Sequence, residues 1–548
     1  MPLSVGFRRL PHGSVLPCGV RTFLDRRPSA EGATPRSPGL QEDCSVGFVL
    51  DYVVVGAGSA GCVLAARLTE DPNIDVLLLE AGGPDKAREI HIPAAFSKLF
   101  RSDVDWNYDT APEPELAGRS IYWPRGKMLG GSSSMNAMMA IPGSRHDYEV
   151  WPWSWPDVAP VYERVRESLQ VEELRDPNPL TAAFVEAAQQ MGIASSPSLG
   201  PTDLDGVRIT PVTQRRGRRN SAADAYLRPA LKRPNLTVRT HAHVTRVVVE
   251  HGRAVGVEAN GDVVRAREVV LCGGAVNSPQ LLLLSGIGPR DELERHGIPV
   301  VRELAGVGSH LEDHLAAATL FESRKPLSLY AAEKPLQLLR YFLRHTGMLT
   351  SNVAEAAAFV RSRPDIPAPD LELLFAPVLF EDGGLTPPRG HGFTIGAILL
   401  QPRSSGVVRL HSSDPFDAPL IQPRYLSQPE DLKTLVHGVE LARRLATMPA
   451  FAEHAGDELE PGDVPIEQSI RERAQTLYHP VGTCRFGDVV DDELRVRGIA
   501  GLRVVDASVI PRVPRGHTHL PTLMIAERAA SFLRGGARDE PKLVDAAV

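Results

Sequence analysis

Residues 51–61 read Asp-Tyr-Val-Val-Val-Gly-Ala-Gly-Ser-Ala-Gly, an apolar run that leads into a glycine-rich turn. The β-branched residues favour a buried strand, and residues 62–68 continue with good helix formers. A second apolar run, Val76 to Leu79, ends on Glu80. Strand, glycine turn, helix, strand and acid follow one another in the order of a dinucleotide site. The chain is therefore predicted to have an α/β fold with a Rossmann-like domain.

The glycines of this turn have separate expected roles. Gly56 permits the tight turn, Gly58 lets the backbone approach a pyrophosphate, and Gly61 lets the helix pack closely on the strand. The helix N-terminus then faces the phosphate charge. Glu80 can accept hydrogen bonds from ribose hydroxyls. These residues leave open whether the nucleotide is FAD or NAD, and a glycine-rich turn in an unrelated α/β fold is the alternative.

Length and composition are those of a globular protein. A chain of 548 residues can bury a large core and is expected to form two or more domains. Its net charge of −7 argues against nucleic acid or an anionic membrane as the main partner. No apolar run reaches the length of a transmembrane helix. The 5 cysteines are widely spaced, without a Cys-x-x-Cys pair, which favours a reducing compartment, and we expect a cytoplasmic location.

The two ends of the chain are expected to lie outside the folded domains. Residues 1–46, rich in Arg, Pro, Gly and Ser, are predicted to be an unstructured extension, with an organelle transit peptide as the alternative. Residues 537–548 are predicted to be a tail. The nucleotide-binding domain is assigned to residues 47–150, 237–320 and 471–536. Residues 151–236 and 321–470 are assigned to a substrate-binding domain, in which alternating apolar runs indicate a mixed or antiparallel sheet covered by helices.

Two loops could contact an anion. In residues 128–136, backbone N–H groups and serine hydroxyls could cradle an anionic group, although the segment could equally be a flexible turn. Residues 215–219 read Arg-Arg-Gly-Arg-Arg. This run lacks interleaved aromatic residues and lies in an acidic protein, so we predict a solvated loop rather than a nucleic-acid site.

Two late segments carry histidines that could act in catalysis. Pro480 biases His479 away from helical geometry. His517 and His519 come just before a predicted helix that starts near Thr522. A helix N-terminus favours an anionic ligand and lowers the pKa of a nearby histidine, which keeps the imidazole neutral and able to act as a base.

These histidines could also have other roles. His479, His517 and His519 could bind a metal, but no acidic residue or cysteine clusters with them in sequence, so no metal site is predicted. For His310 and His314 the expected role is structural. The absence of a Gly-x-Ser-x-Gly elbow argues against a hydrolase.

From about Phe48 to Leu533 the chain resembles the glucose-methanol-choline (GMC) oxidoreductase family and its choline dehydrogenase-like members. Five motifs in the family's order carry the resemblance: residues 51–80, 124–136, 273–289, 479–483 and the segment around His517. The resemblance implies FAD rather than NAD, and oxidation of an alcohol (a CH–OH donor) to the carbonyl by hydride transfer to flavin N5. It implies a small-molecule alcohol and an electron acceptor, oxygen or a carrier, as partners.

The resemblance also implies site residues. His479 would be the general base, and His517 the second catalytic position. Glu80 would contact the adenosine ribose and Val244 the adenine. The implied FAD-binding residues are Gly56, Gly58, Ser59, Ala60, Gly61, Glu80, Gly130, Gly131, Ser132, Asn136, Ala137, Met138, Val244, Asp506, Ala507 and Thr518.

The sequence departs from the family pattern at two positions. Met135 lines up with a histidine through which some members attach FAD, so the flavin is expected to be non-covalent. Ala316 stands near the place where choline-oxidising members have a glutamate, which makes choline a less expected substrate. A lyase or decarboxylase acting on cyanohydrins or fatty acids is the main alternative function, and a flavoprotein without catalysis is a third. The sequence leaves open the substrate, the acceptor, the oligomeric state and whether His519 joins the site.

Overall fold

The dinucleotide unit lies in a seven-stranded sheet of a computed structural model that describes residues 50–536. The strand order is β8-β2-β1-β11-β10-β9, with β22 also paired to β11. Strands β8, β2, β1, β11 and β22 run parallel, whereas β9, β10 and β11 form an antiparallel meander. The strands are β1 (Leu50–Val55), β2 (Val76–Leu79), β8 (Leu236–Arg239), β9 (Val244–Glu250), β10 (Arg253–Ala259), β11 (Asp262–Leu271) and β22 (Leu502–Val504). The predictions for residues 1–46 and 537–548 fall outside the described residues.

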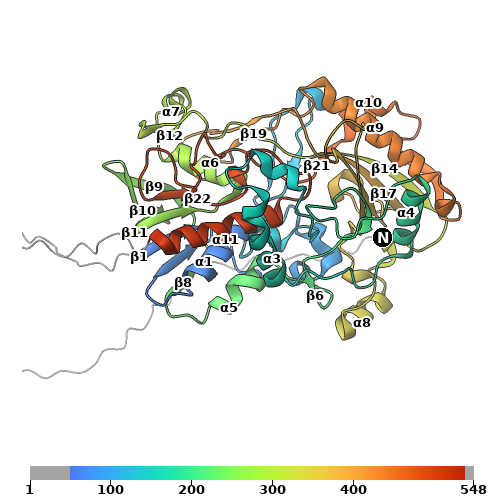
Figure 1. Cartoon of the computed structure of the whole chain (residues 1–548), viewed down its shortest axis with the longest axis horizontal. Coiled ribbons are helices and arrows are strands. Elements are labelled where there is room, and N and C mark those ends of the chain that lie inside the picture. The colour runs from blue at the N-terminus through green and yellow to red at the C-terminus, as the bar shows by residue number, and fades with distance from the viewer. Residues whose placement is uncertain (1–49, 537–548) are drawn as a thin grey trace, which may run out of the picture. The chain divides into compact units, whose positions relative to one another are not determined.

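Two helices cover the parallel part of this sheet. Helix α1 (Ser59–Leu68) follows the glycine turn, and α11 (His519–Gly536) packs against it, as Figure 1 shows. Nearly every residue of α1 is buried, because the helix lies between the sheet and α11. The Tyr52 hydroxyl donates to the Leu533 carbonyl at 2.9 Å, which joins β1 to the end of α11.

The glycine turn has the geometry that its sequence predicts. Gly56 has φ +99°, a conformation that L side chains rarely adopt. A Cβ at Gly61 would come within 1.9 Å of the Gly56 carbonyl oxygen, so the helix start and the turn approach as closely as only glycine allows. The final helix begins at His519 rather than near Thr522, since Pro521 is tolerated in the first turn of a helix.

A second seven-stranded sheet has the order β20-β14-β17-β16-β15-β5, with β21 paired to β14. All its pairings are antiparallel. Helices α4 (Pro179–Gln190) and α9 (Pro429–Ala446) pack on it over a core that includes Phe184, Phe375 and Phe393. The strands are β5 (Gly206–Ile209), β14 (Leu315–Ser323), β15 (Ala356–Val360), β16 (Leu371–Ala376), β17 (Gly392–Leu399), β20 (Ala455–Glu460) and β21 (Gln475–Thr476).

Shorter elements connect the two sheets. The remaining helices are α2 (Arg88–His91), α3 (Trp155–Leu169), α5 (Arg228–Ala230), α6 (Gly274–Leu284), α7 (Arg290–Arg295), α8 (Pro335–Arg344) and α10 (Ile466–Arg473). The remaining strands form pairs: β3 (Tyr108–Asp109) with β4 (Tyr122–Trp123), β6 (Gln214–Arg215) with β7 (Arg218–Arg219), β12 (Ile287–Gly288) with β13 (Arg302–Glu303), and β18 (Val407–Arg409) with β19 (Leu420–Gln422). Within residues 50–536, no helix is both long and apolar enough to cross a bilayer.

Candidate active site

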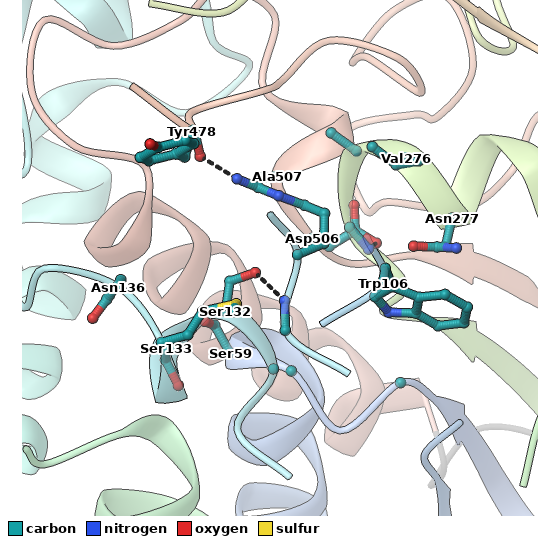
Figure 2. A pocket seen from close by; sticks show the side chains of 18 of the residues that line it. Ser59, Trp106, Ser132, Ser133, Asn136, Val276, Asn277, Tyr478, Asp506 and Ala507 are labelled. Atoms are coloured by element: carbon teal, nitrogen blue, oxygen red, sulfur yellow. Dashed lines mark hydrogen bonds between the residues drawn. The ribbon is translucent and has the colours of Figure 1, made fainter. Parts of the chain in front are cut away.

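A cavity of about 340 Å³ opens beside the carboxyl ends of the parallel strands. Val55, Leu79 and Leu271, which end β1, β2 and β11, lie in its wall. Ligands of open α/β sheets bind at this edge. Figure 2 shows part of the wall, with Ser59, Ser132, Asn136 and Asp506. The wall contains these predicted residues: Gly56, Gly58, Ser59, Ala60, Glu80, Gly131, Ser132, Asn136, Ala137, Met138, Val244, His479, Asp506, Ala507, His517 and Thr518.

Two predicted glycines do not line the cavity but shape its wall. Gly61 lies in the helix start that packs on Gly56. Gly130 has φ +85°, and a Cβ there would come within 2.1 Å of the Ser134 hydroxyl oxygen. A Cβ on its neighbour Gly131 would come within 2.7 Å of the Gly58 Cα. The two glycine turns are therefore in direct contact, which brings the loop at 131–138 to the dinucleotide turn.

Glu80 is buried in the cavity wall next to the glycine turn. Its carboxylate accepts hydrogen bonds from the backbone N–H groups of Ala57, at 2.8 Å, and Gly82, at 2.9 Å. Burial raises the pKa of Glu80 to about 7, against the lowering effect of these two bonds. Each carboxylate oxygen can accept a further bond, so Glu80 can still accept from ribose hydroxyls.

Asp506 fixes the start of α6 to the loop after β22. Its carboxylate accepts from the Ser278 hydroxyl at 2.6 Å, from the Gly274 N–H at 2.8 Å and from the Ser508 N–H at 2.8 Å. Burial raises the pKa of Asp506, and these bonds oppose that effect. The carboxylate therefore serves mainly to hold two backbone segments of the cavity wall.

Arg219 holds the loop at 131–138 in place through hydrogen bonds. Its guanidinium donates to the Ile90 and Ser133 carbonyls and to Asn136 Oδ1, the last at 2.7 Å. Burial lowers its pKa to about 9. The prediction that the whole run 215–219 is solvated is therefore wrong for Arg219, although Arg215, Arg216 and Arg218 are exposed. The β6–β7 hairpin turns the side chain of Arg219 inward, which the run of like residues does not reveal.

The backbone of His479 is held by Asp313. The His479 N–H donates to Asp313 Oδ1 at 2.7 Å, and the hydroxyls of Thr476 and Tyr425 donate to the other oxygen, each at 2.5 Å. Burial raises the pKa of Asp313 to about 6. Burial also lowers the pKa of His479 well below 6.5, and its histidine neighbours add to this effect. His479 is therefore a neutral imidazole near pH 7, as a general base must be.

His314 fixes the tautomer of His479. The Leu400 carbonyl can only accept, so the Nε2 of His314, 3.2 Å away, is the nitrogen that carries its proton. Burial lowers the pKa of His314 to about 3, which keeps the ring neutral and its Nδ1 an acceptor. That Nδ1 lies 3.0 Å from Nδ1 of His479. In this tautomer of His314, His479 donates from Nδ1 and its Nε2 is unprotonated.

His517 lies beside His479 in the cavity wall, with 4.7 Å between the ring centroids and 67° between the ring planes. Its backbone N–H donates to the Ile141 carbonyl at 2.8 Å. Its Nε2 lies 3.3 Å from Oε1 of Glu372, a fully buried residue of β16 whose second oxygen has no partner among the described residues. The contact with Glu372 engages Nε2, so Nδ1 is the ring nitrogen of His517 left for a group in the cavity.

His519 also lies in the cavity wall. Its Nδ1 is 3.1 Å from the Ser59 hydroxyl, and its buried Nε2 has no protein partner among the described residues. Burial lowers the pKa of His519 to about 4, so the ring is neutral. An unpartnered polar nitrogen in the wall suits a ligand with polar groups at that point. Across the described residues, no group of three or more histidine, cysteine or acidic side chains is arranged to hold a metal ion.

A glycine turn of the dinucleotide-binding type at the edge of a parallel sheet, with His479 and His517 in the wall of the same cavity, is the arrangement of a nucleotide-dependent oxidoreductase. The two models of the GMC oxidoreductase family match residues 50–316 and 402–526. An uncharacterised GMC-type oxidoreductase of Mycobacterium tuberculosis is 49% identical over 524 residues, which cover 88% of this chain and 99% of that protein. The chain belongs to the GMC oxidoreductase family.

Two further relatives support the cofactor and the class of activity. The alcohol dehydrogenase [acceptor] of Pseudomonas putida is 41% identical, with 88% of this chain and 95% of the relative covered. Formate oxidase of Aspergillus oryzae, in a structure concerned with its FAD modification, is 27% identical with a TM-score of 0.83, and the match covers 90% and 99% of the two chains. The predicted cofactor FAD and the predicted class, an alcohol-oxidising flavoenzyme, are confirmed.

The cavity wall fits FAD. Gly56 and Gly58 lie in the cavity wall, and without side chains their backbone can approach a pyrophosphate closely. Glu80 can meet ribose hydroxyls, and the unpartnered Nε2 of His519 can meet a polar group of the cofactor. The roles assigned to individual residues remain predictions.

Four residues that shape this site, Asp313, His314, Glu372 and Arg219, were not predicted from the sequence to belong to it. His314 was expected to be structural, whereas it contacts His479 directly. Glu372 is the acidic residue of the otherwise apolar strand β16, and its fully buried side chain (0% exposed) lies next to His517. A charged residue within an otherwise apolar strand was the available signal. For Arg219 the sequence offered no comparable signal.

The flavin should be released when the protein is unfolded. The buried Met135 side chain lies in the cavity wall, and a thioether cannot form the covalent link to FAD that the family resemblance associates with a histidine at this position. We expect acid or detergent denaturation to free all the FAD, measured as absorbance in the filtrate after the protein is removed. Yellow colour that stays with the denatured chain would contradict this prediction.

Proposed function

We propose that this protein oxidises uncharged alcohols with an apolar body, with His479 as the general base. The hydrogen bond between His314 and His479 carries the proposal, because it leaves the Nε2 of His479 free of a proton. His479 accepts the hydroxyl proton at Nε2. His517 donates a hydrogen bond to the same oxygen from its free ring nitrogen and stabilises the developing alkoxide. FAD, when bound, supplies the acceptor for the hydride that leaves the alcohol carbon.

The side chains around the histidines support an uncharged substrate. Phe96, Phe100, Leu374 and Phe380 line the same cavity as the two histidines. The two carboxylates in the cavity wall, Glu80 and Asp506, both hold backbone N–H groups elsewhere in the wall. A cationic alcohol such as choline would thus lack a free carboxylate to balance its charge. An apolar alcohol buries its body against the aromatic rings at no such cost.

The test is anaerobic bleaching of the flavin by a panel of alcohols. We expect 1-octanol and benzyl alcohol to bleach the flavin absorbance, and choline to leave it unchanged at the same concentration. Faster bleaching by choline than by any uncharged alcohol would contradict the proposed substrate class. Bleaching by no alcohol would contradict alcohol oxidation itself, since a lyase or decarboxylase need not reduce the flavin. Peroxide release on admitting air then distinguishes oxygen from another acceptor.

A further inference from the structure

Helix α8 turns its apolar face toward solvent. Leu336, Leu339 and Leu343 fall on one face of the helix and are 65%, 56% and 72% exposed. Phe342 beside them is also exposed, whereas Tyr341 is the buried residue that attaches the helix to the protein. A surface helix normally turns its apolar face to the core. Figure 1 shows α8 standing out at the lower edge of the view.

Cationic side chains flank this apolar face. Lys334, Arg340 and Arg344 are exposed on or next to α8. The loop with Arg215, Arg216 and Arg218 adjoins the end of the helix, since a Cβ at Gly217 would come within 2.5 Å of the His345 carbonyl oxygen. Among residues 50–536 none of these six side chains is in an ion pair. This local cluster contrasts with the net charge of −7 of the chain.

We propose that this surface binds the face of an anionic phospholipid bilayer. We call it the α8 surface, and it consists of Lys334, Leu336, Leu339, Arg340, Phe342, Leu343 and Arg344 with Arg215, Arg216 and Arg218. A short helix with exposed leucines and phenylalanine beside arginines lies in the interface, with its apolar side chains among the acyl chains and its cations at the headgroups. The net charge of −7 predicted that an anionic membrane is not the main partner. A net charge is a sum over the whole chain, so it does not reveal a local cationic cluster.

A second copy of the chain fits this surface less well than a bilayer. In a symmetric dimer the same patch meets itself, which would bring the arginines of one copy toward those of the other. An anionic bilayer instead provides negatively charged headgroups for the arginines and an apolar interior for the leucines. Charge complementarity thus selects the bilayer.

The α8 surface connects to the active-site cavity through one apolar cluster. Tyr341 and Leu349 are buried in the same cluster as Phe96 and Phe100, which line the cavity. The Tyr341 hydroxyl donates to the His91 carbonyl at 3.1 Å and so fixes the helix in place. A bilayer on this side would concentrate lipid-soluble alcohols and electron acceptors next to the cavity.

The test is flotation of the full-length, FAD-loaded protein with vesicles of phosphatidylcholine, alone or mixed with phosphatidylglycerol. Leu339→Glu/Leu343→Glu removes the apolar contact, and Arg340→Glu/Arg344→Glu reverses two charges. Val301→Glu is the matched control, because Val301 is 47% exposed but lies between α7 and β13. The Arg-rich residues 1–46 are the same in every variant.

We expect the wild-type protein and Val301→Glu to float with the mixed vesicles and only weakly with pure phosphatidylcholine. Each double variant should lower the partition coefficient on mixed vesicles by about tenfold or more, while FAD content and Tm stay unchanged. Equal flotation of all four proteins would place binding elsewhere in the chain and overturn the proposal. A wild-type protein that binds neither kind of vesicle would also overturn the proposal. If, in addition, Leu339→Glu/Leu343→Glu converted a dimer to a monomer in light scattering, the surface would be a dimer interface instead.

Discussion

Replacing His479 with alanine should slow flavin reduction by at least about a hundredfold while FAD stays bound, since this is the scale of a lost general base. The hydrogen bonds of Glu80 and Asp506 elsewhere in the cavity wall do not involve the imidazole of His479. Asp313 binds the backbone N–H of residue 479, which alanine retains. The rate constant of anaerobic reduction, measured by stopped-flow absorbance with a proven alcohol, reports the step directly.

The matched control is His437→Ala, which removes a half-exposed histidine from helix α9. We expect its reduction rate and FAD content to equal those of the wild type. If His479→Ala were reduced as fast as this control, His479 would not be the base. A loss of FAD from His479→Ala would instead show that the histidine supports the cofactor.

The pH dependence gives a second readout of the same residue. A base acts only when neutral, and burial holds the pKa of His479 well below its ordinary value of 6.5. The lowered pKa means that the ring stays neutral as the pH falls, so the wild-type reduction rate should not halve on acidification to pH 6.5. A rate that halves at or above that pH would contradict the assignment.

The dinucleotide unit could be predicted from sequence because its signal is local. Strand, turn, helix and acid lie within residues 51–80, and each residue type has a steric or charge requirement there. The environment of His479 is different. Its partner His314 is 165 positions away, and its backbone is held by Asp313 from the end of another segment. Nothing in the spacing of these residues shows that β14 brings them to the same cavity.

The burial of individual charged residues could not be predicted from the sequence either. The four arginines of residues 215–219 look equivalent in sequence, yet the hairpin buries Arg219 and exposes the others. A side chain's environment depends on register, which a run of identical residues does not specify. Net charge fails for a related reason, because it sums over the whole surface while a binding partner meets one patch.

Replacing His314 with phenylalanine should slow flavin reduction by about tenfold to a hundredfold, part of the full effect of general-base catalysis. His314 acts as a positioning residue, because it accepts the Nδ1 proton of His479 and so keeps Nε2 free. A phenyl ring fills similar space but cannot accept, and the proton of His479 is then free to occupy either nitrogen.

Two further variants separate this role from packing. In His314→Gln, the carboxamide can donate to the Leu400 carbonyl and accept from His479, as the imidazole does. We therefore expect His314→Gln to recover most of the reduction rate, whereas His314→Leu should behave like His314→Phe. If all three variants lost the rate in proportion to their loss of Tm, His314 would serve packing alone. Because glutamine and leucine differ here mainly in hydrogen bonding, a rate that follows the bond and not the Tm shows that His314 sets the proton position on His479.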